Sequence, residues 1–171
     1  WRYGDDHPSL KLSIRREESG PQRTISINQA KTLDRYLCNK TCDKGIRDLA
    51  IFSLLLDTGL RASEICRLNR DNLDLDNKLL SVKVKGGKWG YGIYSDITLL
   101  RIIDWLDRRV DIVDGSKAVF VSIKGSRPGT RLTASGLRII IRKWGERSGV
   151  GNLSPHDFRR SFATISTILQ A

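Results

Sequence analysis

Apolar side chains recur at helical spacing from about residue 24 onward. Ala30, Leu33 and Leu37 lie three or four positions apart and predict an amphipathic helix that ends near residue 38. Ser26 or Asn28 would cap its start, because both side chains accept hydrogen bonds from unpaired backbone N–H groups. Residues 1–23 mix glycine, proline, serine and charges, and we expect them to form a linker or arm that enters the domain.

The segment from about residue 43 to residue 57 is the most apolar part of the chain. Its apolar positions are too dense for the single stripe of a surface helix, so we expect a central core helix. A Thr-Gly pair ends it, and the following LRASEICRL predicts a third helix. The inward positions of that helix are Leu60, Ile65 and Leu68.

The spacing of the apolar residues then changes to every second position. In LLSVKVK (79–85) apolar and polar residues alternate, which is typical of a half-buried strand. Gly86 and Gly87 follow, and WGYGI resumes the pattern, so the segment predicts a β-hairpin. A helix over about 98–110, a short strand AVFVS (118–122), a helix over about 133–147 and a last helix from Pro155 complete the pattern. The predicted fold is α+β, mainly α, with a small antiparallel sheet.

Composition excludes several classes of protein. The 171 residues suit one domain, and no apolar run approaches the roughly 20 residues of a membrane span. Cys38, Cys42 and Cys66 are an odd number, which argues against a disulfide scaffold and favours a reducing compartment. We interpret all three as ordinary small apolar residues and expect no metal and no cofactor. The chain begins at Trp1 and contains no methionine, so we expect it to be a piece of a longer protein.

Positive charge is concentrated in the second half of the chain. The net charge is +11, of which residues 1–77 contribute +1 and residues 78–171 contribute +10. Between Gly115 and Gly145 there is no acidic residue, which indicates a polyanion partner. A basic face kept for solubility is the alternative. The basic residues of this stretch are Lys117, Lys124, Arg127, Arg131, Arg138, Arg142 and Lys143.

The segment LSPHDFRRSFAT carries candidate chemistry at a helix start. Ser154 suits the N-cap, Pro155 the first helical position, and Asp157 lies three residues after the cap. His156 and Arg159 lie one turn apart, roughly opposite the predicted apolar stripe. That stripe consists of Phe158, Phe162, Ile165 and Leu169. An imidazole and a guanidinium beside a helix N-terminus suit a phosphate, and the alternative is a surface His beside a surface Arg.

Two further segments place basic residues where an anion could bind. Arg61 follows a glycine break and precedes a helix, so its guanidinium should lie close to the core and require an anion, either Glu64 or an external phosphate. In the hairpin, Lys83 and Lys85 share the polar face, and Lys85 and Lys88 flank the Gly-Gly turn. Such lysines can reach into a DNA groove, or they can keep an edge strand soluble.

Together, TGLRASE, KGGK and SPHDFRRSFAT resemble the catalytic domain of the tyrosine recombinases, the phage integrase family, over residues 24–171. The resemblance implies that Arg61 is the first catalytic arginine, that Lys85, in preference to Lys88, is the hairpin lysine, and that His156 and Arg159 are the HxxR pair. Residue 160, often histidine in the family, is arginine here. The likeness also implies contacts to DNA from the hairpin and the basic stretch, namely from Lys83, Lys88, Lys124, Arg127, Arg131, Arg138, Arg142 and Lys143.

The family cleaves double-stranded DNA without a metal, through a tyrosine that forms a 3′-phosphotyrosyl bond. That tyrosine lies downstream of HxxR in the family, and none of the chain's tyrosines, Tyr3, Tyr36, Tyr91 and Tyr94, occupies its place. The resemblance therefore implies a fragment that is inactive alone, with residues 1–23 as the linker from a missing DNA-binding domain. It also implies a tetramer on DNA for the full-length protein, a fragment that can be monomeric, and a cytoplasmic location at the nucleoid. The alternatives are a relative that binds DNA without cutting it, and a basic helical domain that binds RNA or a protein.

Overall fold

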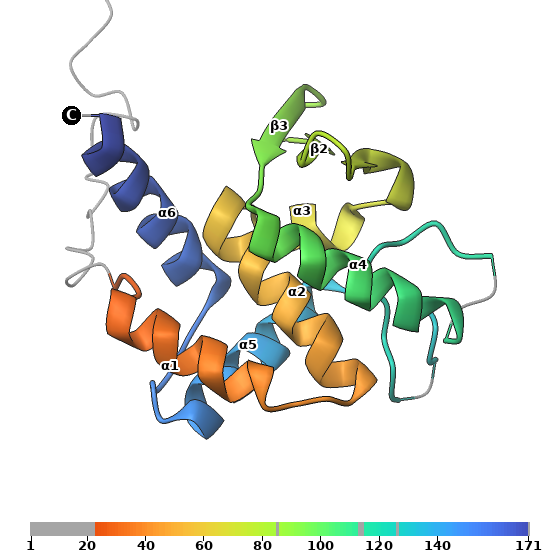
Figure 1. The fold of residues 1–171 in the computed structure, drawn as a ribbon, viewed down its shortest axis with the longest axis horizontal. Coiled ribbons are helices and arrows are strands. Elements are labelled where there is room, and N and C mark those ends of the chain that lie inside the picture. The colour runs from red at the N-terminus through yellow and green to blue at the C-terminus, as the bar shows by residue number, and fades with distance from the viewer. Residues whose placement is uncertain (1–22, 85, 113–114, 126, 171) are drawn as a thin grey trace, which may run out of the picture.

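The computed structural model describes residues 23–84, 86–112, 115–125 and 127–170, with only the backbone of 164–170. These residues form α-helices and a small antiparallel sheet, as the sequence predicts (Figure 1). The helices are α1 (Ile27–Cys38), α2 (Asp43–Thr58), α3 (Ala62–Arg67), α4 (Asp96–Val110), α5 (Ala134–Ser148) and α6 (Pro155–Gln170), and a short 3-10 helix, η2, spans Arg70–Asn72. The strands are β1 (Leu73–Asp74), β2 (Leu79–Lys83) and β3 (Trp89–Ile93).

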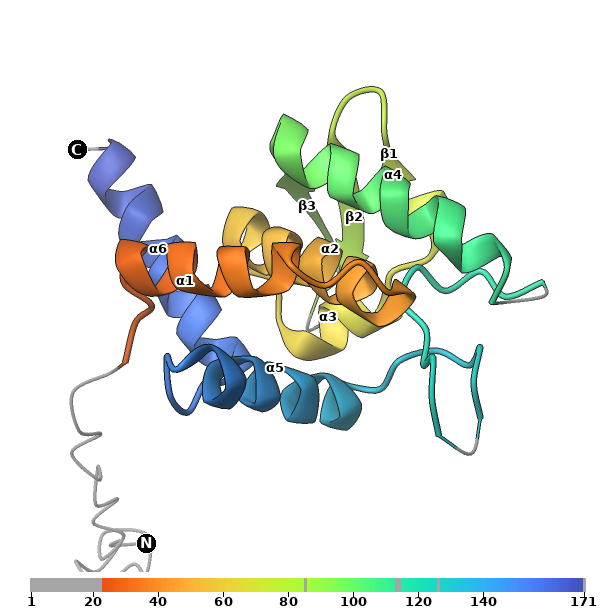
Figure 2. The same cartoon turned by 60° about the horizontal axis from the view of Figure 1, so that its bottom comes forward.

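Helix α2 is the centre of the fold. It packs against α1, α4 and α6, and Figures 1 and 2 show it enclosed by these helices. Nearly every residue from Gly45 to Leu55 is buried, including Ile51, Leu54 and Leu55, which are fully buried. This confirms the predicted core helix, because only a helix covered on most sides can bury so many apolar positions.

A buried polar network also holds α2 in place. The guanidinium of Arg47 donates to the carboxylate of its neighbour Asp48 and, through Nη1, to the carbonyl of Val121. The indole Nε1 of Trp144 in α5 donates to the other oxygen of Asp48 at 3.0 Å. Because each of these buried groups has a partner, the network fixes α5 and the 118–121 segment against α2 without an unpaired charge.

The predicted starts of α1 and α5 agree with the structure, and each is capped by a nearby side chain. Ser26 and Gln29 form a reciprocal capping box at α1, so Ser26 rather than Asn28 is the N-cap. The Thr133 hydroxyl accepts from the N–H of Gly136 at the start of α5. At the other end of α2, Gly59 has φ +58° and terminates the helix in a left-handed conformation.

The sheet has the order β1-β2-β3, with Ser81 opposite Tyr91 and Lys83 opposite Trp89. This confirms the predicted hairpin. The large side chains of β3, Trp89, Tyr91 and Ile93, are exposed, and glycines occupy the alternate positions. A Cβ at Gly92 would lie 3.2 Å from Leu80 and 3.3 Å from Thr58, so the glycine allows the sheet to approach the end of α2 closely.

The predicted strand AVFVS (118–122) is wrong as a strand. Its first four residues are fully buried, but the chain bends at Val119 and Phe120 and forms only isolated bridges, Asn69 with Ala118 and Val121 with Arg131. Its hydrogen bonds go to separate places, such as Val119 N to Leu68 O and Leu132 N to Phe120 O. A short apolar run indicates burial, but a continuous ladder also needs a long enough partner, which the fold does not supply here.

The three cysteines, interpreted from the sequence as ordinary small apolar residues, lie in different environments. Cys66 in α3 is buried, but Cys38 and Cys42 are exposed around the α1–α2 connection. No group of three potential metal ligands occurs among the described residues. Within the same residues, no helix combines the length and the apolar character that crossing a membrane requires.

Candidate active site

The start of α6 is held by its first turn. The carboxylate of Asp157 accepts from the backbone N–H of Ser154 at 2.7 Å and from its hydroxyl at 2.9 Å. Phe158 is fully buried and packs edge-on against Phe52 of α2, with ring centroids 5.9 Å apart. His156 is therefore exposed on the opposite side of the helix, as predicted. Ile165 and Leu169 of the predicted stripe lie outside the residues whose side chains are described.

Arg159 rests on the end of the central helix. Its Nη1 donates to the carbonyl of Gly59 at 2.9 Å. A Cβ at Gly59 would lie only 2.5 Å from Cδ1 of Phe162, so α6 packs directly against this glycine. The side chain of Arg159 is thereby fixed against Gly59, which lies two residues before Arg61 in the sequence.

Arg61 is held by a buried carboxylate. Glu64 accepts from the backbone N–H of Arg61 at 2.8 Å and from its Nη1 at 2.9 Å. The Glu64 side chain is only 5% exposed, whereas that of Arg61 is 46% exposed. Of the two anions considered from sequence, Glu64 is a direct partner. Because a guanidinium has five N–H donors, the exposed part of Arg61 can still bind a second anion.

These residues meet at one small pocket. It has a volume of about 210 Å³ and is lined by Arg61, Ala62, Ser63, Arg138, Pro155, His156 and Arg159. The starts of α3 and α6 and the first half of α5 thus converge, although they are far apart in the sequence. The pocket brings Arg61, His156 and Arg159 together, as the resemblance implies.

Arg138 is the lining residue that sequence reasoning did not place here. Helical spacing puts it on a basic face of α5, but spacing within one helix does not say what lies beside that face. Three guanidinium groups and an imidazole line the pocket, and none of its lining residues is acidic. Such a site suits an anion with several oxygen atoms, and its small volume suits a single phosphate group.

A larger cavity of about 610 Å³ lies between α1, α2 and α4. It contains none of the predicted site residues. Two of its charged residues, Asp34 and Arg101, form an ion pair with each other at 2.7 Å. The smaller pocket is therefore the better candidate for chemistry, because its charges converge without being neutralised by the residues that line it.

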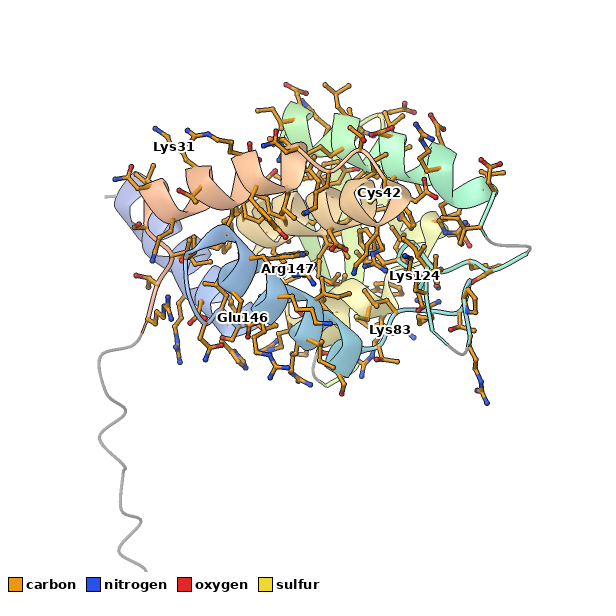
Figure 3. The ribbon with its side chains drawn as sticks, turned by 90° about the horizontal axis from the view of Figure 1, so that it is seen from below. Lys31, Cys42, Lys83, Lys124, Glu146 and Arg147 are labelled. Atoms are coloured by element: carbon orange, nitrogen blue, oxygen red, sulfur yellow. The ribbon has the colours of Figure 1, made fainter. Side chains whose placement is uncertain are left out.

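Several predicted DNA-contact residues are exposed. Lys83 lies over the ring of Trp89 at 5.5 Å, and Lys88, Lys124 and Arg127 are exposed. Figure 3 shows Lys83 and Lys124 beyond the N-terminal end of α5, with Glu146 and Arg147 toward its other end. Lys85, the predicted hairpin lysine, lies outside the described residues.

Other residues of the basic stretch have partners within the protein. Arg131 donates to the carbonyls of Cys66 and Leu68 and to the side chain of Asn69, so its guanidinium closes the C-terminal end of α3. Arg142 pairs with Glu146 at 3.7 Å. Lys143 lines a different pocket, of about 200 Å³, together with Lys40, Lys44 and Arg147. The residues of the basic stretch therefore lie in several different environments.

Comparison with known proteins identifies relatives of the same kind. Residues 24–166 match the model of the "Phage integrase family". Tyrosine recombinase XerC of Chromobacterium violaceum is 33% identical over 162 residues, which cover 94% of this chain and 52% of that protein. Tyrosine recombinase XerC of Corynebacterium glutamicum is 34% identical over 119 residues, which cover 70% of this chain and 37% of that protein. The chain thus spans about half or less of these relatives.

Solved structures share the fold. The crystal structure of XerA recombinase superposes with a TM-score of 0.74 at 27% identity, covering 88% of this chain and 52% of that one. The XerH site-specific recombinase bound to palindromic difH substrate in a post-cleavage complex gives a TM-score of 0.72 at 19% identity, covering 86% of this chain and 42% of that one. The second likeness shows the fold alone.

Proposed function

Because the chain belongs to the phage integrase family of tyrosine recombinases, we propose that it is the catalytic domain of a site-specific DNA recombinase or integrase. Its substrate is a phosphodiester of double-stranded DNA, which is cut and rejoined through a 3′-phosphotyrosyl intermediate. The observation that carries this proposal is the pocket in which Arg61, His156 and Arg159 meet without an acidic lining residue.

The arginines act by electrostatic preorganisation. Negative charge builds on the non-bridging oxygens of the phosphate as the nucleophile attacks, and guanidinium groups already fixed in place stabilise it without reorganisation. Glu64 fixes Arg61, and the carbonyl of Gly59 fixes Arg159. Both partners leave donors of each guanidinium for the phosphate.

Proton transfer completes the reaction. A tyrosine oxygen forms a bond to phosphorus while the bond to the 5′-oxygen breaks. His156 takes the proton of the tyrosine hydroxyl, and Lys85 gives a proton to the leaving 5′-oxygen. The pocket is lined by none of the described tyrosines, Tyr36, Tyr91 and Tyr94. We propose that the nucleophile is a tyrosine outside the present sequence.

Exposed basic residues of several elements bind the duplex by its phosphates. The hairpin supplies Lys83 and Lys88, the loop after residue 121 supplies Lys124 and Arg127, and α5 supplies Arg142 and Lys143. Support for DNA as the partner comes from related structures, since XerH and the Tn1549 transposon integrase were both solved with DNA. By the same resemblance, we infer a tetramer on paired DNA sites for the full-length protein and a location at the nucleoid.

The test uses the longer protein that contains this chain together with its nucleophile. Given nicked recombination-site DNA without magnesium, it should form a covalent protein–DNA adduct that denaturing gel electrophoresis detects. Arg61→Ala and Arg159→Ala should each slow adduct formation at least about 100-fold, the effect of removing one preorganised donor. Arg108→Ala, an exposed arginine of α4, is the control and should leave the rate unchanged.

Two outcomes would contradict the proposal in different ways. An adduct that forms at the same rate in both arginine variants would overturn the roles of these residues. DNA binding without any adduct in the wild-type protein would instead favour the alternative, a relative that binds DNA but does not cut it.

A further inference from the structure

Arg138 occupies a defined place at the pocket because the start of α5 is fixed. The Thr133 hydroxyl caps the helix through the N–H of Gly136, and Leu137 is fully buried. Adjacent residues of a helix point about 100° apart. Burial of Leu137 therefore turns Arg138 to the side of α5, where it lines the pocket with Arg61 and Arg159.

The charge of Arg138 acts on α3, which carries Arg61 at its start. Burial raises the pKa of the Cys66 thiol in α3 to about 11, and the positive charges of Arg131, Arg138 and Arg47 act against this shift. The helices α3 and α5 also pack against each other. Helix α5 therefore lies along one side of the pocket and contributes the cation Arg138 to it.

Among the described residues, Arg138 differs from the other two arginines of the pocket in having no hydrogen-bond or ion-pair partner. Arg61 is bound by Glu64, and Arg159 by the carbonyl of Gly59. Within the described part of the chain, the Arg138 side chain forms no hydrogen bond or ion pair. An uncommitted guanidinium beside two fixed ones, in a pocket without an acidic lining residue, is available for an anion.

From this arrangement we infer that Arg138 is a third phosphate-binding arginine of the pocket, and that it donates to a non-bridging oxygen of the phosphate held by Arg61 and Arg159. The inference rests on the proposed function and deepens it. It gives Arg138 a role at the scissile phosphate itself, distinct from a general contact to the DNA backbone. The phosphate of the cleaved strand stays on its 3′ end in this chemistry, so a 3′-phosphate at a nick is a suitable probe.

The test compares two variants of this chain on two DNA probes. The probes are short duplexes nicked at the centre, one with a 3′-phosphate and one with a 3′-hydroxyl at the nick, and fluorescence anisotropy gives their dissociation constants. Arg138→Gln removes the inferred contact, and Arg142→Gln removes an equal charge one turn later on the same exposed side of α5. The ratio of the two dissociation constants within each variant cancels the general loss of DNA affinity.

The wild-type chain and Arg142→Gln should both prefer the 3′-phosphate, and Arg138→Gln should reduce that preference about tenfold, as expected for one charge-assisted hydrogen bond. Thermal unfolding should be unchanged, because Arg138 is exposed. If Arg61→Gln and Arg159→Gln reduce the preference but Arg138→Gln does not, the inference is wrong and the proposed function stands. If the wild-type chain shows no preference, the pocket does not hold a phosphate, and both are overturned.

Discussion

Single residues decide which cations of this protein face a ligand. Arg61, Arg131 and Arg159 are all arginines in or near the basic surface, but their partners differ. Arg61 and Arg159 each use part of the guanidinium on a neighbouring group and leave the rest toward the pocket. Arg131 instead donates to two carbonyls and an Asn side chain. The role of each arginine therefore follows from the acceptors that surround it.

Because Arg131 bonds to groups within the protein and Arg127 is exposed, we expect one to act on stability and the other on DNA binding. Arg131→Gln should lower the free energy of unfolding by about 1–3 kcal/mol, because it removes hydrogen bonds to partly buried carbonyls at the end of α3. Arg127→Gln, a nearby exposed arginine, should leave stability unchanged and weaken binding to duplex DNA. Urea unfolding and a binding titration measure the two effects. Equal stability of the two variants would contradict the structural role of Arg131.

The cysteines should differ in reactivity for a similar reason. The thiolate is the reactive form, and burial raises the pKa of Cys66 to about 11, so little thiolate forms near pH 8. The pKa of Cys38 is also raised, by partial burial and then by the nearby Asp34 carboxylate. A chromogenic disulfide reagent at pH 8 should therefore modify Cys42 first, Cys38 more slowly, and Cys66 only after unfolding in guanidinium. Rapid reaction of three thiols in the folded protein would contradict the burial of Cys66.

At the scale of elements, the end of α2 organises the site. Gly59 terminates this helix, accepts a hydrogen bond from Arg159, and lies against Phe162. Arg61 follows two residues later and starts α3. The central helix thus positions both arginines through one turn, and α6 packs against the same turn.

Gly59→Ala tests this arrangement, with Gly149→Ala as the matched control. Both glycines terminate helices in the left-handed conformation, with φ of +58° and +78°. An added Cβ would collide with Phe162 at Gly59 but would meet nothing within 4 Å at Gly149. Gly149→Ala should cost about 1 kcal/mol from backbone strain alone, and Gly59→Ala about 1–3 kcal/mol more from overpacking.

Gly59→Ala should also reduce the preference for a nick that carries a 3′-phosphate, because α6 and Arg159 move together. Calorimetric unfolding and the nicked-duplex titration measure the two effects. Equal costs and equal phosphate preference in the two variants would show that the contact of α6 with Gly59 does not position the site.

At the scale of the whole molecule, several carboxylates of the second half of the chain lie away from α5. Acidic residues of the second half include Asp96, Asp104, Asp107 and Asp111, which lie on or next to α4. Figure 2 shows α4 and α5 on opposite sides of α2. Helix α5, with its arginines, therefore lies away from these carboxylates, although α4 also carries Arg101, Arg108 and Arg109. We expect the DNA-binding face to lie on the α5 side of the molecule.

The salt dependence of DNA binding should reflect this face. If at least six of its cations contact phosphates, affinity for a non-specific duplex should fall about 10³-fold between roughly 50 and 200 mM salt, through release of counterions. Anisotropy titrations at several salt concentrations measure the slope. A fall of less than about tenfold would mean that fewer than half of these cations contact DNA.

Local signals predicted much of the fold. The helix starts near Ser26 and Ser154 were predicted from caps, and the β-hairpin was predicted from alternation around Gly86 and Gly87. These signals succeed because a cap or a tight turn is satisfied within a few residues of its own sequence. The 118–122 segment failed as a strand because its pairing depends on distant residues.

The sequence by itself determined the helices, the hairpin, the basic second half, and the motifs with Arg61, His156 and Arg159. Only the tertiary structure decided which basic residues share a pocket. It placed Arg138 beside the motif residues and set Arg131 against α3. The reason is physical: periodicity fixes the direction of a side chain relative to its own helix, whereas its neighbours depend on how that helix packs against the others.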